Sequence, residues 1–246
     1  VVEAVPVGIA EASALPHPLR IATEGAFPPF NFVDETGALR GLEVDLVHDL
    51  CATLDAECVL TPHPWQALLP GLRQGKYDVV AASLRVPAHL PEGIAFTRAY
   101  FPTAAVFAAR LPESGSLRAA DFPGKRIAVQ QGTRLEAWLR ANHPEAVLQP
   151  HADAVDAYLA LAEGRADLVF DDAVRISRWL DAPAGTCCAA LPDVVVAPDI
   201  LGSGIAFAVR ESDTRLRDAL NGGVATLETD GKIAELSDRY FTIPIN

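Results

Sequence analysis

Residues 79–82 read Val-Val-Ala-Ala, an apolar run in which hydrophobic and polar residues do not alternate. Such a run is typical of a strand that is buried on both faces, as in a parallel sheet covered by helices. Before it, apolar residues at helical spacing predict a short helix from Trp65, and Gly75–Asp78 predicts a turn. Residues 95–101 have strand character again. The stretch 65–101 therefore predicts an α/β unit.

The same unit predicts a place for a ligand. In open α/β sheets, ligands bind beyond the C-terminal ends of the strands. Here that end carries Ser83 and Arg85, and Trp65 adds an aromatic ring. We expect the unit to present these groups to a crevice.

Size and charge narrow the class of protein. The chain has 246 residues, half of them apolar, and a net charge of -12. This length fits two lobes of about 100 residues each. The negative charge argues against nucleic acid and anionic membrane surfaces as main partners. No apolar run approaches the roughly 18 residues that a membrane-spanning helix needs.

Residues 1–18 differ in composition from the rest and are rich in Ala, Val and Pro. Ala12-Ser13-Ala14 resembles a signal-peptidase site, but a basic start and a continuous apolar core are missing. The segment is therefore either the remnant of a leader (signal peptide) or a flexible arm, and we exclude it from the predicted fold.

The cysteines bear on the redox compartment. Cys51 lies near the end of a predicted helix and Cys58 just beyond it, so a short-loop disulfide between them is expected. Cys187 and Cys188 are adjacent, and adjacent cysteines rarely bond without strain, so a bond there is not expected. No Cys-x-x-Cys occurs and the six histidines show no metal-type spacing, so we expect neither a metal site nor a cofactor.

The order of the predicted elements supports two α/β units. Residues 19–23 and 57–60 predict strands on either side of a helix that ends near Cys51. The second half repeats the alternation, with strands at 126–129, 146–148 and 167–170 and helices at 133–141 and 155–162. Two last helices are expected at 216–227 and after Gly231.

Three runs carry a family resemblance: LRIATEGAFPPFNFVDETGALRGLEVDLVHDLCATLDAEC, WQALLPGLRQGKYDVVAASL and IAFTRAYF. The chain resembles, over residues 19–243, the extracytoplasmic solute-binding proteins of ABC importers for polar amino acids and opines. It looks most like the branch that binds lysine, arginine, ornithine, histidine, octopine or nopaline. The Cys51–Cys58 pair matches a disulfide of that branch.

The resemblance implies a fold and a setting. The fold would be α/β and of the type II periplasmic binding protein kind, with a mainly parallel sheet flanked by helices in each lobe and two hinge strands. The predicted boundaries are 19–101 and 204–246 for lobe one, 106–192 for lobe two, and 102–105 and 193–203 for the hinge. A periplasmic monomer that delivers its solute to ABC permease subunits is implied.

Four lobe-one positions match ligand contacts of the family. Glu24 would meet the cationic end of a basic ligand and Phe27 would cover it. Trp65 would stack on the ligand, which suits the attraction between a cation and an indole face. Ser83 corresponds to a serine of the binding loop, whereas its neighbour Ala82 stands where a second serine is common. The alternatives are that Trp65 is simple core and that Glu24 is a solvated charge.

Lobe two is expected to hold the other end of the ligand. Thr133-Arg134-Leu135-Glu136 fits a capping box, and with Gly132 it would present helix N–H groups to a carboxylate. An ordinary helix start is the alternative. Asp172 aligns with the carboxylate that holds the α-ammonium of the ligand, and Asp171 adds a charge beside it. Asp172 is equally suited to be the N-cap of a helix at 173–180.

Departures from the family pattern concern the carboxylate of the ligand. Leu90 stands where family members carry an arginine that forks onto the α-carboxylate. Arg85 and Arg134 occupy positions that are usually small and polar, and either can re-create the carboxylate site or be a surface residue. The pattern favours an opine-like or modified amino acid; an amine without carboxylate fits if both arginines point away.

The sequence thus predicts a non-catalytic binding protein for a small molecule with amine and carboxylate groups. Two alternatives stay open. One is an enzyme of the periplasmic cyclohexadienyl dehydratase type, in which Glu24, Asp171 or Asp172 would be the general acid. The other is the ligand-sensing domain of a receptor. Neither a base nor a nucleophile is arranged beside the acids, so we expect no catalysis.

Overall fold

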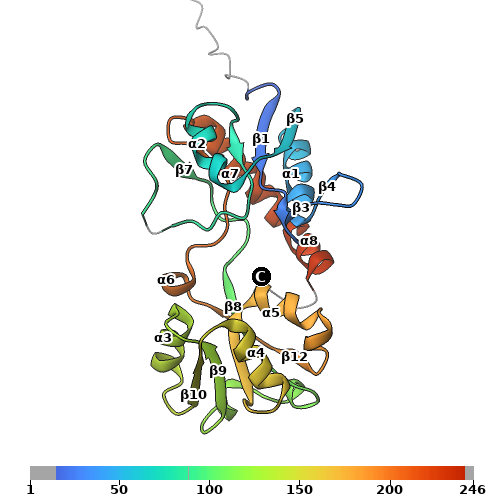
Figure 1. Cartoon of the computed structure of the whole chain (residues 1–246). Helices are drawn as coiled ribbons and strands as arrows, with labels where there is room; N and C mark the ends of the chain where they lie inside the picture. Colours follow the sequence, from blue (N-terminus) through green and yellow to red (C-terminus); the bar gives the residue numbers. More distant parts are fainter. Residues whose placement is uncertain (1–14, 88, 242–246) are drawn as a thin grey trace, which may run out of the picture.

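Two five-stranded sheets organise the chain in the computed structural model, which describes residues 15–87 and 89–241. Figure 1 shows them as two lobes, one above the other, each with its own helices. The α/β class and the two-lobed architecture are therefore confirmed. Of the predicted leader or arm at 1–18, residues 1–14 lie outside the described residues.

Lobe one is built on a sheet with the strand order β5-β1-β6-β13-β7. Its strands are β1 (Leu19–Thr23), β5 (Cys58–Pro62), β6 (Val79–Val80), β7 (Ile94–Phe96) and β13 (Ala208–Arg210). Its helices are α1 (Leu42–Thr53), α2 (Trp65–Arg73), α7 (Thr214–Thr229) and α8 (Lys232–Tyr240). A small antiparallel sheet of β2 (Ala26–Phe27), β3 (Asn31–Val33) and β4 (Leu39–Arg40) precedes α1.

Lobe two is built on a sheet with the order β10-β9-β11-β8-β12. Its strands are β8 (Ala104–Arg110), β9 (Arg126–Gln130), β10 (Val147–His151), β11 (Leu168–Asp172) and β12 (Cys188–Val196). Its helices are α3 (Arg134–Asn142), α4 (Ala154–Ala162) and α5 (Ala173–Leu180), and the short α6 (Pro198–Leu201) follows β12. Single 3-10 turns lie at Glu113–Gly115, Ala119–Asp121 and Pro183–Gly185.

The central strands are buried on both faces, as the unalternating run at 79–82 predicts. In β6, Val79 lies in the apolar cluster that contains α1 and α7, whereas Val80 lies in the cluster that contains α2. In β1, Ile21 and Ala22 divide between the same two clusters. Successive side chains of a strand point to opposite faces, so helices must cover both sides of this sheet.

Each sheet is mainly parallel, as predicted, and one strand in each runs against the others. β1 runs parallel to β5 and β6, and β9 runs parallel to β10 and β11. β13 and β8, in contrast, pair antiparallel with both of their neighbours. Each of these two strands follows a crossing from the other lobe, and therefore enters its sheet from the opposite end.

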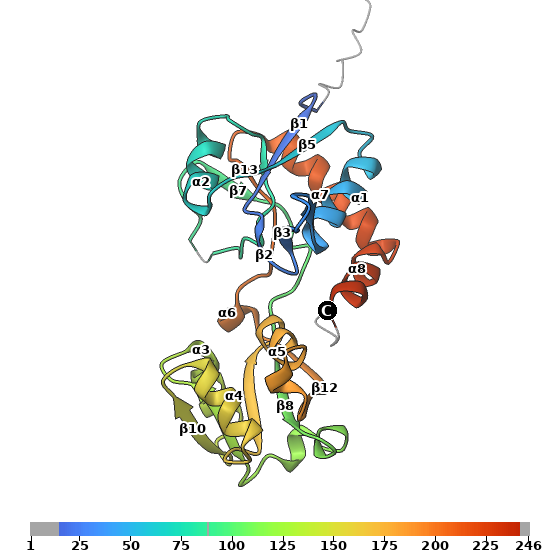
Figure 2. The ribbon, with the colours of Figure 1, turned by 45° about the vertical axis from the view of Figure 1, so that its right-hand side comes forward.

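Two crossing segments, 97–103 and 197–207, join the lobes, and both views show them running between the sheets (Figures 1 and 2). They pair with each other in antiparallel fashion at Phe101 and Ile205. The Ile205 N–H donates to the carbonyl of Phe101 at 2.8 Å, and the Tyr100 N–H donates to the carbonyl of Ile205 at 2.9 Å. The loop after β6 also pairs with the second crossing segment, because Arg85 forms an antiparallel β-bridge with Ile205.

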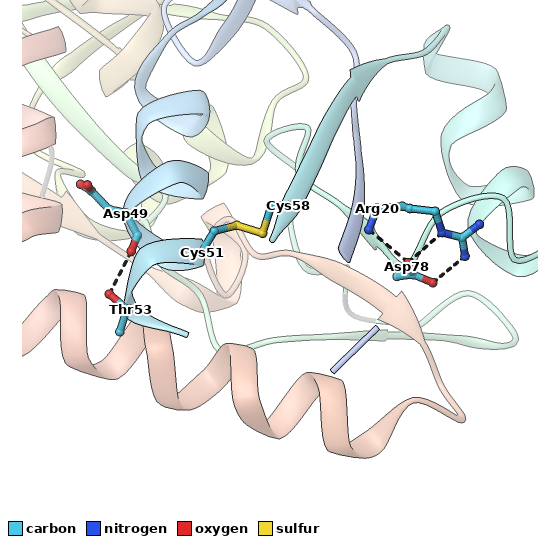
Figure 3. The surroundings of a disulfide bond; sticks show 6 residues. All are labelled: Arg20, Asp49, Cys51, Thr53, Cys58 and Asp78. Atoms are coloured by element: carbon cyan, nitrogen blue, oxygen red, sulfur yellow. Dashed lines mark hydrogen bonds and ion pairs between the residues drawn. A yellow bond between two sulfur atoms is a disulfide. The ribbon is translucent and has the colours of Figure 1, made fainter. Parts of the chain in front are cut away.

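In each lobe, an arginine–aspartate ion pair joins two neighbouring strands of the sheet, and we call this pair the clamp. Arg20 in β1 makes a two-pronged contact with Asp78, which precedes β6, through bonds of 3.0 and 2.8 Å (Figure 3). Arg126 in β9 contacts Asp167, which precedes β11, in the same way at 3.2 and 2.7 Å. Each acid also accepts the backbone N–H of its arginine, so one carboxylate fixes the register of two neighbouring strands.

Both disulfide candidates are bonded. Cys51 at the end of α1 is joined to Cys58 at the start of β5, as predicted (Figure 3). Cys187 and Cys188 are bonded as well, contrary to expectation. The bond joins neighbours whose Cα atoms are 3.8 Å apart, at the start of β12.

Candidate ligand-binding site

The predicted site residues gather in two cavities, one on each lobe. The lobe-one cavity, of about 360 Å³, is lined by Glu24, Phe27, Trp65, Ala82 and Ser83. The lobe-two cavity, of about 290 Å³, is lined by Arg85, Gln130, Thr133, Arg134, Leu135, Asp171, Asp172, Arg175 and Leu201. Of the predicted contacts, Gly132 alone is not among the lining residues. Both cavities lie at the C-terminal ends of parallel strands, where α/β proteins bind ligands.

The lobe-one cavity has aromatic walls. Trp65 is the first residue of α2 and is 48% exposed, which excludes the alternative that it is simple core. Phe27 is 37% exposed and stacks on Phe30 with ring centroids 5.5 Å apart. Glu24 lines the same cavity from the loop that follows β1 and is partly exposed. An acid and aromatic rings in one cavity suit a cationic group, because both the carboxylate and the rings attract it.

A buried acid that the sequence analysis did not single out holds this cavity together. Glu43 in α1 is 1% exposed, and its carboxylate accepts hydrogen bonds from the Asn31 amide at 2.6 Å and from the Tyr100 hydroxyl. It also accepts the backbone N–H of Ser83 at 2.6 Å and the Ser83 hydroxyl at 2.9 Å. Burial raises the pKa of Glu43, and the hydrogen bonds oppose that rise.

The two carboxylate oxygens of Asp172 have different partners. Oδ1 caps α5 by accepting the N–H groups of Val174 at 3.0 Å and Arg175 at 3.3 Å. Oδ2 accepts a hydrogen bond from the Arg85 guanidinium of lobe one at 2.7 Å. The capping alternative is therefore correct and does not compete with a binding role, because the second oxygen faces the other lobe.

Asp171 is more buried than its neighbour, at 3% exposure. Its carboxylate accepts the Tyr158 hydroxyl at 2.6 Å and the Asp172 N–H at 2.7 Å, and it contacts Arg175 at 3.3 Å. Burial raises the pKa of Asp171, and these bonds oppose it. The side chain thus anchors the end of β11 to α4 and α5.

The helix start at Thr133 differs from the predicted capping box. Thr133 Oγ1 caps α3 by accepting the N–H of Glu136 at 3.2 Å. The Glu136 carboxylate returns to the N–H of Gly132 at 2.7 Å, one residue earlier than the Thr133 N–H. The N–H of Gly132 is therefore already hydrogen-bonded, which leaves the first turn of α3 beyond it to face a ligand.

Three arginines line the lobe-two cavity, and two of them pair with carboxylates. Arg85 pairs with Asp172, and Arg175 pairs with Asp171. Arg134 is exposed and makes no ion pair or hydrogen bond within the described part of the chain. Leu90 is 57% exposed and lines neither cavity. The arginine side chains that could contact a carboxylate therefore line the lobe-two cavity, whereas position 90 carries a leucine.

The sequence analysis did not identify Arg175 and Gln130 as lining residues. Arg175 lies four residues after Asp171, a helical spacing that brings the side chains together, and this spacing was the available signal. Gln130 ends β9 beside the cavity. Among residues 15–87 and 89–241 there is no cluster of three or more metal-ligating side chains. No helix within these ranges is long and apolar enough to cross a membrane.

Two α/β lobes that face each other across polar cavities define the class of two-lobed binding proteins. Residues 19–243 match the bacterial extracellular solute-binding proteins, family 3, and the chain belongs to this family. The putative ABC transporter arginine-binding protein 2 of Escherichia coli K12 is 30% identical over 236 residues, which cover 95% of each chain.

Solved structures share the fold along the whole chain. A periplasmic His/Glu/Gln/Arg/opine family-binding protein from Silicibacter pomeroyi, in complex with lysine, is 27% identical with a TM-score of 0.57, covering 93% of this chain and 100% of that one. The L-cystine solute receptor of Neisseria gonorrhoeae, unliganded and open, is 22% identical with a TM-score of 0.75, covering 92% and 94%.

Proposed function

We propose that the protein binds a small molecule with amine and carboxylate groups between its lobes and delivers it to an ABC permease. Family membership supports the delivery role. The charges of the two cavities support the ligand: an acid with aromatic walls on lobe one, and acids and arginines together on lobe two. The family also supports a periplasmic monomer, with hinge segments at 102–105 and 193–203.

The observation that carries the ligand class is the guanidinium of Arg134, which has no ion-pair or hydrogen-bond partner among residues 15–87 and 89–241. In the lobe-two cavity, Arg85 and Arg175 already have carboxylate partners, so one positive charge is left over. An α-ammonium that bonds to Asp172 displaces Arg85 and makes it available too. Two arginines then face carboxylates of the ligand, whereas Glu24 and Trp65 face a cation. This set fits an opine, a basic amino acid that carries a second carboxylate.

Catalysis is not part of this proposal. The relatives are binding proteins. Among the three acids considered as a general acid, Asp171 has a raised pKa, but its oxygens are engaged by Tyr158, Arg175 and the Asp172 N–H, so it is poorly placed to protonate a leaving group. We expect a bound amino acid or opine to be recovered unchanged, and prephenate not to be consumed.

Calorimetry with three related probes tests the proposal. Octopine, L-arginine and agmatine share a guanidinium and carry two, one and no carboxylates. We expect octopine to bind most tightly and agmatine least. Arg134→Ala should weaken octopine binding about tenfold or more, because a hydrogen bond to a charged group contributes about 1.5–3 kcal/mol.

A matched control is Arg178→Ala, since Arg178 is an exposed arginine of α5 outside both cavities. It should leave all three affinities unchanged. Binding of none of the probes would contradict the proposed function. Equal weakening of octopine and agmatine by Arg134→Ala would contradict the role of Arg134 as a carboxylate partner.

A further inference from the structure

Glu43 lines neither cavity, yet its carboxylate contacts both loops of the lobe-one cavity. One loop is reached through Asn31, whose Oδ1 accepts the N–H of Gly25 at 2.9 Å, next to Glu24. The other is reached directly through the N–H and hydroxyl of Ser83. Ser83 has a φ of 51°, a left-handed conformation that is unfavourable for a residue with a side chain, and these two bonds hold it there.

The same carboxylate reaches the junction between the lobes. Tyr100 donates its hydroxyl to Glu43, and its backbone N–H bonds to Ile205 of the second crossing segment. Ile205 also bridges to Arg85, two residues beyond Ser83. The loop from Ser83 to Arg85 is therefore held at one end by Glu43 and at the other by the crossing segment.

The donors around Glu43 fix the direction of the Ser83 hydroxyl. An ionised carboxylate only accepts hydrogen bonds, at about four lone-pair positions. Oε1 takes the Ser83 N–H and the Tyr100 hydroxyl, and Oε2 takes the Asn31 amide and the Ser83 hydroxyl. The Asn31 oxygen already accepts from Gly25, so its NH₂ group faces Glu43. The Ser83 proton is therefore directed at Oε2, and only oxygen lone pairs of Ser83 are left for the cavity.

We propose that Glu43 is a positioning residue that keeps the Ser83 hydroxyl an acceptor toward the ligand and thereby selects for an ammonium group. An acceptor at this point bonds to an N–H donor and repels a carboxylate. Arg85, two residues further on, reaches Asp172, so a ligand group at Ser83 lies near the place proposed for the α-ammonium. The inference rests on the proposed function.

Glu43→Gln tests the inference with L-arginine and 5-guanidinopentanoate, which lacks the α-ammonium. The glutamine keeps an oxygen at Oε1, because the backbone N–H of Ser83 is fixed and can only donate, whereas the Asn31 side chain that donates to Oε2 can rotate away. Its NH₂ then replaces Oε2, and the Ser83 hydroxyl must turn to accept from it and point its proton at the ligand. We expect the preference for L-arginine over the desamino probe to fall about tenfold, the loss of one hydrogen bond to a charged group.

The double-mutant cycle with Ser83→Ala separates positioning from a structural role. If Glu43 acts through the Ser83 hydroxyl, Glu43→Gln changes the preference in the wild-type background and leaves it unchanged in the Ser83→Ala background. A loss of fold alone would weaken both probes equally. Asp45→Asn is the matched control, because Asp45 lies on the same helix and bonds to Arg239 and Tyr240.

The possible results distinguish the positioning role of Glu43 from the proposed function. If wild-type protein binds L-arginine and Glu43→Gln leaves the preference unchanged, the positioning role is overturned and the proposed function stands. If wild-type protein binds neither L-arginine nor octopine, both are overturned. Should Glu43→Gln fail to fold, Glu43→Asp keeps two acceptor oxygens, so it should weaken both probes by the same factor; a changed preference would overturn the role.

Discussion

The two oxygens of Asp172 have separate tasks, and their separation can be tested at the level of one atom. Oδ1 caps α5 and Oδ2 meets Arg85. Asparagine caps a helix about as well as aspartate, but it carries no charge. We expect Asp172→Asn to weaken L-arginine binding tenfold or more in calorimetry while the free energy of unfolding in urea changes little. Asp172→Ala should lower the affinity for L-arginine and also lower the free energy of unfolding, the latter by about 1 kcal/mol.

Asp153 provides the control for that comparison. It caps α4 by accepting the N–H of Asp156 at 2.9 Å and lines neither cavity. Asp153→Asn should therefore leave affinity unchanged. Unaltered binding in Asp172→Asn would exclude an ionic role for Asp172.

Single residues were predictable where their neighbours in sequence define their role. Trp65 opens a helix, Ser83 follows a strand, and Asp172 precedes a helix, so each could be placed from local pattern and resemblance. Glu43 and the Arg85–Asp172 pair were not predictable. Their partners lie 40 and 87 residues away, and nothing in the local pattern shows that a carboxylate inside an apolar helix face is fully hydrogen-bonded.

At the level of elements, the repeated arginine–aspartate clamp ties strands together in each lobe. Asp78 in lobe one receives bonds from Arg20 and also from Arg210 of β13 at 3.0 Å, and its side chain is 4% exposed. Asp167 in lobe two has Arg126 as its arginine partner, and its side chain is 29% exposed. The lobe-one clamp should contribute more to the free energy of unfolding than the lobe-two clamp. Removing a charge from a buried hydrogen-bonded group leaves its partners unsatisfied, and Asp78 is the more buried acid.

We expect Asp78→Asn to lower the free energy of unfolding by about 2–3 kcal/mol, and Asp167→Asn to lower it less. Burial disfavours the charged form of Asp78, but the bonds from Arg20 and Arg210 outweigh it and lower its pKa. A lowered folded-state pKa stabilises the fold above the unfolded pKa of about 3.9 and loses that effect as pH falls through the folded value. The difference between wild type and Asp78→Asn in urea unfolding should therefore shrink below about pH 4. A pH-independent difference would contradict this assignment.

Elements with a strong local pattern were predicted well, and short ones less so. β1 spans the predicted 19–23, and α4 begins one residue before its predicted start. β6 ends at Val80 instead of continuing to residue 82, because the chain turns at Ser83. β13 has three residues and was not predicted; its antiparallel pairing depends on strands more than 100 residues away, which no local pattern encodes.

At the level of the whole molecule, the Arg85–Asp172 ion pair joins the two lobes. The Arg85 side chain is 54% exposed and that of Asp172 14%. An ion pair with an exposed partner contributes roughly 0–1 kcal/mol, so the zwitterionic ligand can replace it with bonds of its own. The ion pair thus neutralises both side chains but contributes little to the free energy that holds the lobes together.

Closure of the lobes should be visible by small-angle X-ray scattering. If the proposed ligand contacts both cavities, binding of octopine or L-arginine should draw the lobes together and lower the radius of gyration. L-Glutamate, which lacks a cationic side chain and is expected not to bind, is the control. Arg85→Ala removes the contact between the lobes, so without ligand its radius of gyration should equal or exceed that of wild type, and its affinity for carboxylated probes should fall. An unchanged radius of gyration in protein that calorimetry shows to be saturated would contradict closure, and would place the ligand within one cavity.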